Sequence, residues 1–220
     1  MTNNQQATLT LFDYHRSSAA YRVRITLNLK GLAYQSKSIN LLESEEASNE
    51  YRALNPQGLV PTLVVKNEEK GDIILTQSLA ICEYLEELQP EPSIMSEKAF
   101  SRARIRSLAQ LIGCDIHPLD NLRVLNYLED ELSVDKESKM TWYKHWIKVG
   151  FDALEHRLQE SETGDYCHRN KVSLADICLV PQVYNAYRFD CNLSTYPKIV
   201  EIAKRCNQLP AFIKAQPENM

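Results

Sequence analysis

The first part of the chain changes from a strand-like to a helix-like pattern of hydrophobic positions. Residues 8–12, TLTLF, alternate polar and apolar side chains with a period of two, which predicts a β-strand. Residues 18–30 have helical spacing and stop before Gly31, a residue that commonly terminates helices. The pattern therefore predicts a strand followed directly by a helix.

Three further strand patterns and a second helix follow. Residues 34–41 form a weak strand pattern, while LVPTLVV (59–65) and DIILT (72–76) flank the polar turn KNEEKG and predict a hairpin. Residues 78–88, SLAICEYLEEL, then return to helical spacing. The order β-α-β, an undefined middle segment and β-β-α predicts a small α/β domain with a mixed sheet.

From residue 96 onward, strand patterns nearly vanish and amphipathic helices dominate. Pro118 should break one of them, and SLAD (173–176) has the spacing of an N-terminal capping box, with Asp in the place of Glu or Gln. We therefore expect an α/β domain over residues 1–90 and an all-helical domain over residues 91–220, with residues 91–96 as the linker.

Composition narrows the function classes. With 44% hydrophobic and 25% charged residues, the 220-residue chain is typical of a globular protein, and its net charge of −4 argues against nucleic acid as the main partner. We see neither a membrane-spanning run nor a signal peptide at residues 1–10. Six cysteines without a CxxC pair fit reduced thiols in the cytoplasm, and we expect no metal site.

Pro61 interrupts the strand pattern of LVPTLVV. Proline cannot donate a hydrogen bond to a sheet, so Pro61 must lie at a strand start, an edge or a distortion. An edge strand would explain it without any function. A cis Val60–Pro61 bond is the other interpretation, and it would expose the main chain of Val60 to an extended peptide ligand.

Hydroxyl groups also lie at the start of both helices in this part of the chain. Gln77 and Ser78 open one helix, whose free N–H groups could bind a carboxylate or could simply be capped. Ser17 and Ser18 open the other, next to Arg16, and a helix cap is again the simpler interpretation. Each site taken alone is therefore ordinary.

Four motifs in a fixed order resemble the zeta class of the glutathione transferases. SSAAYRVRI (17–25) is similar to the class motif SSCSWRVRI, and NPQGLVPTL (55–63) to NP-x-x-x-VPTL. QSLAICEYLEE (77–87) and ADICLVPQVYNAYRF (175–189) match QSLAI-x-EYLEE and ADLCLVPQVxNAxRF. The resemblance implies a thioredoxin-like N-terminal domain, an all-helical C-terminal domain, glutathione as cofactor and a homodimer.

The resemblance also implies a reaction. Members of the class isomerise maleylacetoacetate to fumarylacetoacetate in the breakdown of tyrosine and phenylalanine, using glutathione. The alternatives are maleylpyruvate isomerisation or a general transferase acting on small halogenated acids. A glutathione transferase-like protein that only binds a partner is a further alternative.

By this resemblance, Ser17 stabilises the glutathione thiolate, with Ser18 as its alternative or helper. Lowering a thiol pKa by two units takes about 2.7 kcal/mol. One hydrogen bond to a charged group supplies roughly 1.5 to 3 kcal/mol, so the serine suffices even though Ala19 replaces the cysteine of many class members. Val60, Pro61 and the Gln77–Ser78 pair are expected to bind the rest of glutathione.

The remaining expected site residues are mostly in the second domain. His117 and Asn121 are expected in the same helical segment, four residues apart, so both can face one side, which the resemblance places against glutathione. Arginines are expected to bind the carboxylates of the diacid substrate. The three candidates are Arg16, Arg123 and Arg188. Two other arginines, Arg22 and Arg24, are expected at the helix surface or at a domain interface.

Overall fold

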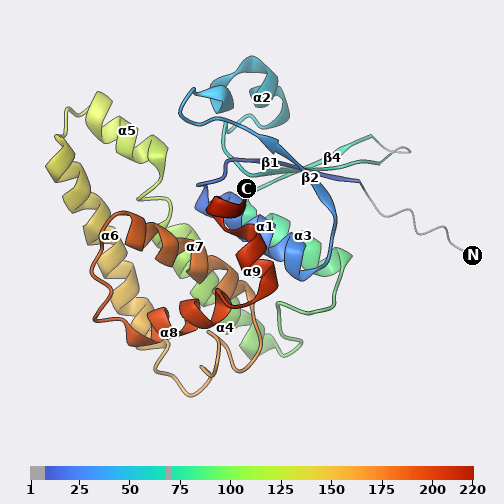
Figure 1. Cartoon of the computed structure of the whole chain (residues 1–220), viewed down its shortest axis with the longest axis vertical. Coiled ribbons are helices and arrows are strands. Elements are labelled where there is room, and N and C mark those ends of the chain that lie inside the picture. Colours follow the sequence, from blue (N-terminus) through green and yellow to red (C-terminus); the bar gives the residue numbers. More distant parts are fainter. Residues whose placement is uncertain (1–7, 68–70) are drawn as a thin grey trace, which may run out of the picture. The chain divides into compact units, whose positions relative to one another are not determined.

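The computed structural model describes residues 8–67 and 71–220, and its chain divides into two compact units (Figure 1). The first unit contains the chain up to Pro92 together with residues 210–220, and the second contains residues 93–209. The centre of the predicted KNEEKG turn and the first seven residues lie outside the described residues. No helix in the described ranges is long and apolar enough to cross a membrane.

A four-stranded mixed sheet forms the centre of the first unit, in the order β2-β1-β3-β4. Strand β1 pairs in parallel with β2 and antiparallel with β3, which in turn pairs antiparallel with β4. The elements up to the end of this unit's main segment are β1 (Leu9–Asp13), α1 (Ser18–Leu29), β2 (Tyr34–Ser38), a 3-10 turn (Glu45–Ala47), α2 (Asn49–Leu54), β3 (Thr62–Val65), β4 (Ile73–Thr76) and α3 (Ser78–Leu88). The predicted α/β order with a mixed sheet is confirmed.

Helices cover both faces of this sheet (Figure 1). Helix α1 packs against α3, and α2 lies on the other side of the strands, where the Tyr51 ring is 6.0 Å from the Phe12 ring. Leu11 and Leu63 point into the core and are fully buried, as the period-two pattern predicts. Gly31 follows α1 at φ 64°, the left-handed conformation that glycine adopts at low cost.

The C-terminal segment returns to the first unit. Helix α9 (Pro210–Ala215) packs on α1, where Asn28 donates to the carbonyl of Ala211 and Arg24 donates to the carbonyl of Ala215. The expected division assigned this segment to the helical domain. Its return depends on contacts between residues 183 and 191 positions apart, which local hydrophobic periodicity does not encode.

The second unit is helical. Its elements are α4 (Ala99–Gln110), a π-helical turn (Leu111–Ile116), α5 (Leu122–Asp130), α6 (Lys136–Arg157), α7 (Leu174–Arg188) and α8 (Pro197–Cys206). The predicted capping box is present, since the buried Asp176 carboxylate accepts from the N–H of Ser173 at 2.8 Å. The chain leaves helical conformation between the π-helical turn and α5, at Pro118, as predicted.

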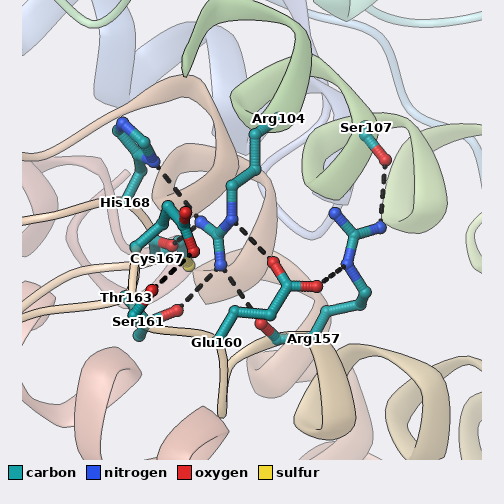
Figure 2. Close-up of polar contacts among 9 residues, drawn as sticks. Arg104, Ser107, Arg157, Glu160, Ser161, Thr163, Cys167 and His168 are labelled. Carbon is teal, nitrogen blue, oxygen red and sulfur yellow. Dashed lines mark hydrogen bonds and ion pairs between the residues drawn. The ribbon is translucent and has the colours of Figure 1, made fainter. Parts of the chain in front are cut away.

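A buried arginine ties α4 to the loop that precedes α7 (Figure 2). The Arg104 guanidinium donates to the Glu160 carboxylate at 2.9 Å, to the Cys167 carbonyl at 2.7 Å and to the Thr163 hydroxyl at 2.9 Å. Burial and the positive charge of Arg104 lower the pKa of His168, so its imidazole stays neutral at neutral pH. This network satisfies the charge of Arg104 inside the helical unit.

Candidate active site

The sheet register brings three of the sequence motifs to one end of the first unit. Phe12 of β1 pairs with Thr62 of β3, which pairs with Thr76 of β4. The turn after β1, the residues before β3 and the residues after β4 therefore all leave the sheet at the same edge. Arg16–Ser18, Val60–Pro61 and Gln77–Ser78 occupy these three positions.

Ser17 is the N-cap of α1. Its half-buried side chain accepts a hydrogen bond from the N–H of Ala20 at 3.2 Å, so the capping interpretation is correct. A hydroxyl that accepts one hydrogen bond still carries a proton to donate. Capping and ligand binding are therefore compatible at Ser17, whereas Ser18 is the buried first residue of the helix and Arg16 is exposed in the preceding turn.

Arg24 forms hydrogen bonds with residues next to the turn that carries Ser17. Arg24 donates to both carboxylate oxygens of Asp13, at 2.7 and 2.9 Å, and to the carbonyl of His15 at 2.9 Å. Both charged side chains are buried. Of the two expected locations for Arg24, the helix surface is therefore wrong, because the arginine pairs with an acid at the end of the neighbouring strand.

Val60 and Pro61 precede β3, and the bond between them is cis. Strand β3 lies between β1 and β4, so the edge-strand interpretation is wrong and the strand-start interpretation is correct. Among the described residues, none forms a hydrogen bond with the main chain of Val60. The Val60 N–H and carbonyl are thus open to a partner at this end of the sheet.

Gln77 and Ser78 begin α3 in an unusual backbone conformation. Gln77 is the N-cap residue at φ 68° and ψ 108°, a region that non-glycine residues rarely adopt and that concentrates at binding sites. Its side chain makes no capping bond and instead donates to the amide oxygen of Gln57 at 2.8 Å. The N–H groups of the first turn of α3 therefore lack a side-chain cap.

Arg22 contacts the start of the same helix. It is 1% exposed, and its Nη1 donates to the Ser78 hydroxyl oxygen at 3.3 Å. The helix-surface alternative is again wrong. Hydrophobic periodicity does not single out this arginine, because its burial depends on α3 packing against α1.

The expected residues of the second unit do not share a helix. His117 lies in the turn after the π-helical segment, whereas Asn121 caps α5 by accepting from the N–H of Arg123 at 3.1 Å. The prediction that His117 and Asn121 lie four apart in one helix is therefore wrong, because the chain breaks at Pro118. Arg123 is exposed on the first turn of α5.

Arg188 is the last residue of α7, and its guanidinium lies 4.9 Å from the ring centre of Phe189. Phe189 in turn packs against Tyr143 of α6, with 4.2 Å between ring centres. A cation over an aromatic face is attracted to the ring electrostatically. The exposed Arg188 thus lies over Phe189, whose ring is tilted by 44° against that of Tyr143.

An acid without a hydrogen-bond partner among the described residues is Asp120. Asp120 is 8% exposed, and within the described ranges neither of its carboxylate oxygens nor the Tyr143 hydroxyl has a hydrogen-bond partner. Burial raises the pKa of Asp120 to about 8. Burial also raises the pKa of Tyr143; the charge of Asp120 raises this pKa further, whereas the charge of Arg188 lowers it.

Comparison with known proteins assigns the family. Models of the glutathione S-transferase N-terminal and C-terminal domains match residues 11–93 and 119–215. A probable maleylacetoacetate isomerase of Vibrio cholerae is 48% identical, over 96% of this chain and 96% of that protein. The match therefore spans both units.

Solved structures agree with this assignment. The holo structure of a maleylpyruvate isomerase, a bacterial zeta-class glutathione S-transferase, has a TM-score of 0.91 and 40% identity, covering 96% of this chain and 98% of that one. A maleylacetoacetate isomerase from Methylobacterium extorquens with bound malonate and glutathione has a TM-score of 0.90 and 35% identity, covering 96% and 97%. The chain belongs to the glutathione S-transferase family, in its zeta class.

Proposed function

We propose that this protein is a glutathione-dependent cis–trans isomerase that converts maleylacetoacetate to fumarylacetoacetate. The observation that carries the proposal is the Ser17 hydroxyl, which caps α1 through its oxygen and keeps its proton for a ligand. The relatives named maleylacetoacetate isomerase support the choice of reaction.

When bound, glutathione supplies a thiolate that adds reversibly to the cis double bond and thereby permits rotation about it. Ser17 would donate a hydrogen bond from its hydroxyl to the sulfur anion, and the N-terminus of α1 would add a favourable partial positive charge. The main chain of Val60 and the uncapped start of α3 at Gln77 and Ser78 bind the peptide part of glutathione. His117 and Asn121 are proposed as further glutathione ligands.

The substrate carries two carboxylates, and guanidinium groups suit them because their N–H donors match a carboxylate in pairs. Arg16, Arg123 and Arg188 are the proposed ligands, and all three are exposed. Arg188 is the best prepared of them, because Phe189 lies under its guanidinium. We further propose a cytoplasmic homodimer that acts in tyrosine and phenylalanine catabolism.

Maleylpyruvate isomerisation is the second candidate, because a zeta-class maleylpyruvate isomerase has nearly the same fold. A transferase acting on small halogenated acids, or a protein that only binds partners, would use the same fold without the isomerase reaction.

One assay separates these functions. Purified protein is mixed with maleylacetoacetate or maleylpyruvate, with and without glutathione, and the fumaryl product is followed. Glutathione-dependent turnover that is faster with maleylacetoacetate supports the proposal, and faster turnover of maleylpyruvate favours the second candidate. Glutathione binding without turnover of either diacid would instead indicate the transferase, and failure to bind glutathione would indicate a binding protein.

A further inference from the structure

Arg22 differs from the other buried cations of this protein. Arg24 pairs with Asp13, Lys30 with Glu86, and Arg104 with Glu160. Arg22 is equally buried, yet it forms no ion pair with any acid of the described chain. Burying an unpaired charge costs free energy of folding. An unpaired buried cation therefore indicates that an anionic ligand binds nearby.

The free hydrogen-bonding capacity of Arg22 is large. Its Nη1 reaches the Ser78 hydroxyl, but Nε and Nη2 are buried and have no hydrogen-bond partner in the described part of the protein. The main chain that carries Arg22 lies next to α3, because Thr26, one turn further along α1, donates to the Arg22 carbonyl at 2.9 Å and its hydroxyl lies 3.1 Å from Cys82 of α3. Ser78 is thus the partner that the described residues offer the Arg22 guanidinium.

The bond from Arg22 fixes the role of the Ser78 hydroxyl. Since Arg22 supplies a donor to the Ser78 oxygen, the hydroxyl proton is free to point toward another acceptor. A hydroxyl whose oxygen accepts a hydrogen bond from a cation is polarised, and it becomes a stronger hydrogen-bond donor. The first turn of α3 adds main-chain N–H groups that have no side-chain cap. All of these groups favour a carboxylate.

Gln77 indicates which carboxylate. Its amide nitrogen donates to Gln57, which leaves its amide oxygen free to accept from an ammonium group. An ammonium next to a carboxylate is the chemistry of an amino-acid head group. In glutathione, that head group belongs to the γ-glutamyl residue, whereas the glycyl end carries a carboxylate alone.

We propose that Arg22 is a positioning residue that supplies, through Ser78, the buried positive charge for the α-carboxylate of the γ-glutamyl residue of glutathione. The proposal rests on the proposed function in taking glutathione as the ligand. It adds a residue on α1 to a site otherwise formed by the start of α3.

Calorimetric titration tests the proposal with two ligands that contain no free thiol. One is S-methylglutathione, and the other is S-methylated 4-aminobutanoyl-cysteinylglycine, which lacks only the γ-glutamyl α-carboxylate. Arg22→Gln should weaken binding of S-methylglutathione by about ten- to a hundredfold and leave binding of the second ligand nearly unchanged. The exposed Arg52→Gln in the same unit is the matched control and should change neither affinity.

A cycle with Ser78→Ala tests the route through the hydroxyl. The loss in the Arg22→Gln/Ser78→Ala double variant should be clearly smaller than the sum of the two single losses. If Arg22→Gln does not fold, Ser78→Ala alone must still show the selective loss for the ligand that carries the α-carboxylate. An equal loss for both ligands, or no loss in a folded variant, would overturn the proposal. Failure of the unchanged protein to bind S-methylglutathione would overturn the glutathione function itself.

Discussion

Asp13 and Arg24 form a buried ion pair, 2.7 Å long, under the turn that carries Ser17. Arg24 also donates to the carbonyls of His15 and Ala215, so one guanidinium joins the end of β1, the turn and the C-terminal segment. The pair therefore contributes both to stability and to the position of the candidate thiolate ligand.

Replacing Asp13 by Asn should leave Arg24 charged and without its carboxylate. Removing one member of a buried pair typically costs about 3 to 5 kcal/mol, so we expect a loss of that order in the free energy of unfolding, measured by urea denaturation. The exposed pair Lys148–Asp152 is the control, and Lys148→Met should cost less than about 1 kcal/mol. Equally small losses in both variants would show that the buried pair contributes no more to the free energy of unfolding than the exposed pair does.

Ser17→Ala should raise the pKa of the bound glutathione thiol by about one to two units, because one hydrogen bond to a charged group is lost. The thiolate ultraviolet absorbance of the complex, titrated against pH, measures this directly. Activity at neutral pH should fall by the factor that corresponds to this pKa shift, because the ionised fraction of the thiol falls.

Ser48→Ala is the matched control for Ser17→Ala. Ser48 caps α2 with the same 3.2 Å acceptor bond, to the N–H of Tyr51. Both variants should lose roughly 0.5 to 2 kcal/mol of stability, but only Ser17→Ala should shift the thiol pKa. A thiol pKa that stays unchanged in Ser17→Ala would transfer the role to another group, with Ser18 as the first candidate.

Arg188→Gln should raise KM for the diacid by about ten- to a hundredfold while the affinity for glutathione stays unchanged, because a charge-assisted bond to one carboxylate is lost. Phe189→Leu should give a smaller increase in KM, since it removes the aromatic face under the guanidinium and keeps the charge. Steady-state kinetics with the substrate identified above measures both effects. The exposed Lys204→Gln on α8 is the control, and a comparable rise in KM there would point to a nonspecific effect of charge.

Asp120 should make stability depend on pH. Its pKa is about 8 in the folded protein and near 3.9 when unfolded, so between these values the folded state holds a proton that the unfolded chain has lost. The stabilisation is complete below about pH 4 and disappears as the pH rises through about 8, with a slope of up to about 1.4 kcal/mol per pH unit.

Asp120→Asn should remove this slope. Compared with the unchanged protein, the variant should become progressively more stable, with a larger free energy of unfolding, from about pH 5 to about pH 8. Urea denaturation at several pH values measures the difference, with the exposed Asp130→Asn as the control. Parallel stability curves for Asp120→Asn and the unchanged protein would mean that the carboxyl is ionised in the fold.

The local sequence determined the elements whose signals lie within a few residues. The spacing of apolar side chains predicted α1, α3 and the β3–β4 hairpin, Gly31 marked the end of α1, and SLAD marked the start of α7. These elements follow from helix and strand periodicity and from the chemistry of helix ends, both of which act over one or two turns. The four motifs also identified the family, because the order of residues in a motif can be read from the sequence without knowledge of the structure.

Only the tertiary structure decided which charged groups are buried and what they contact. Arg22 and Arg24 lie two residues apart in the same helical pattern. Arg24 nevertheless forms an ion pair with Asp13, whereas Arg22 donates a hydrogen bond to Ser78 and pairs with no acid of the described chain. Likewise, the register of β1, β3 and β4 brings the three N-terminal motifs to one edge. Such contacts join residues that are far apart in the chain, and their energies depend on burial and on partners that no local pattern specifies.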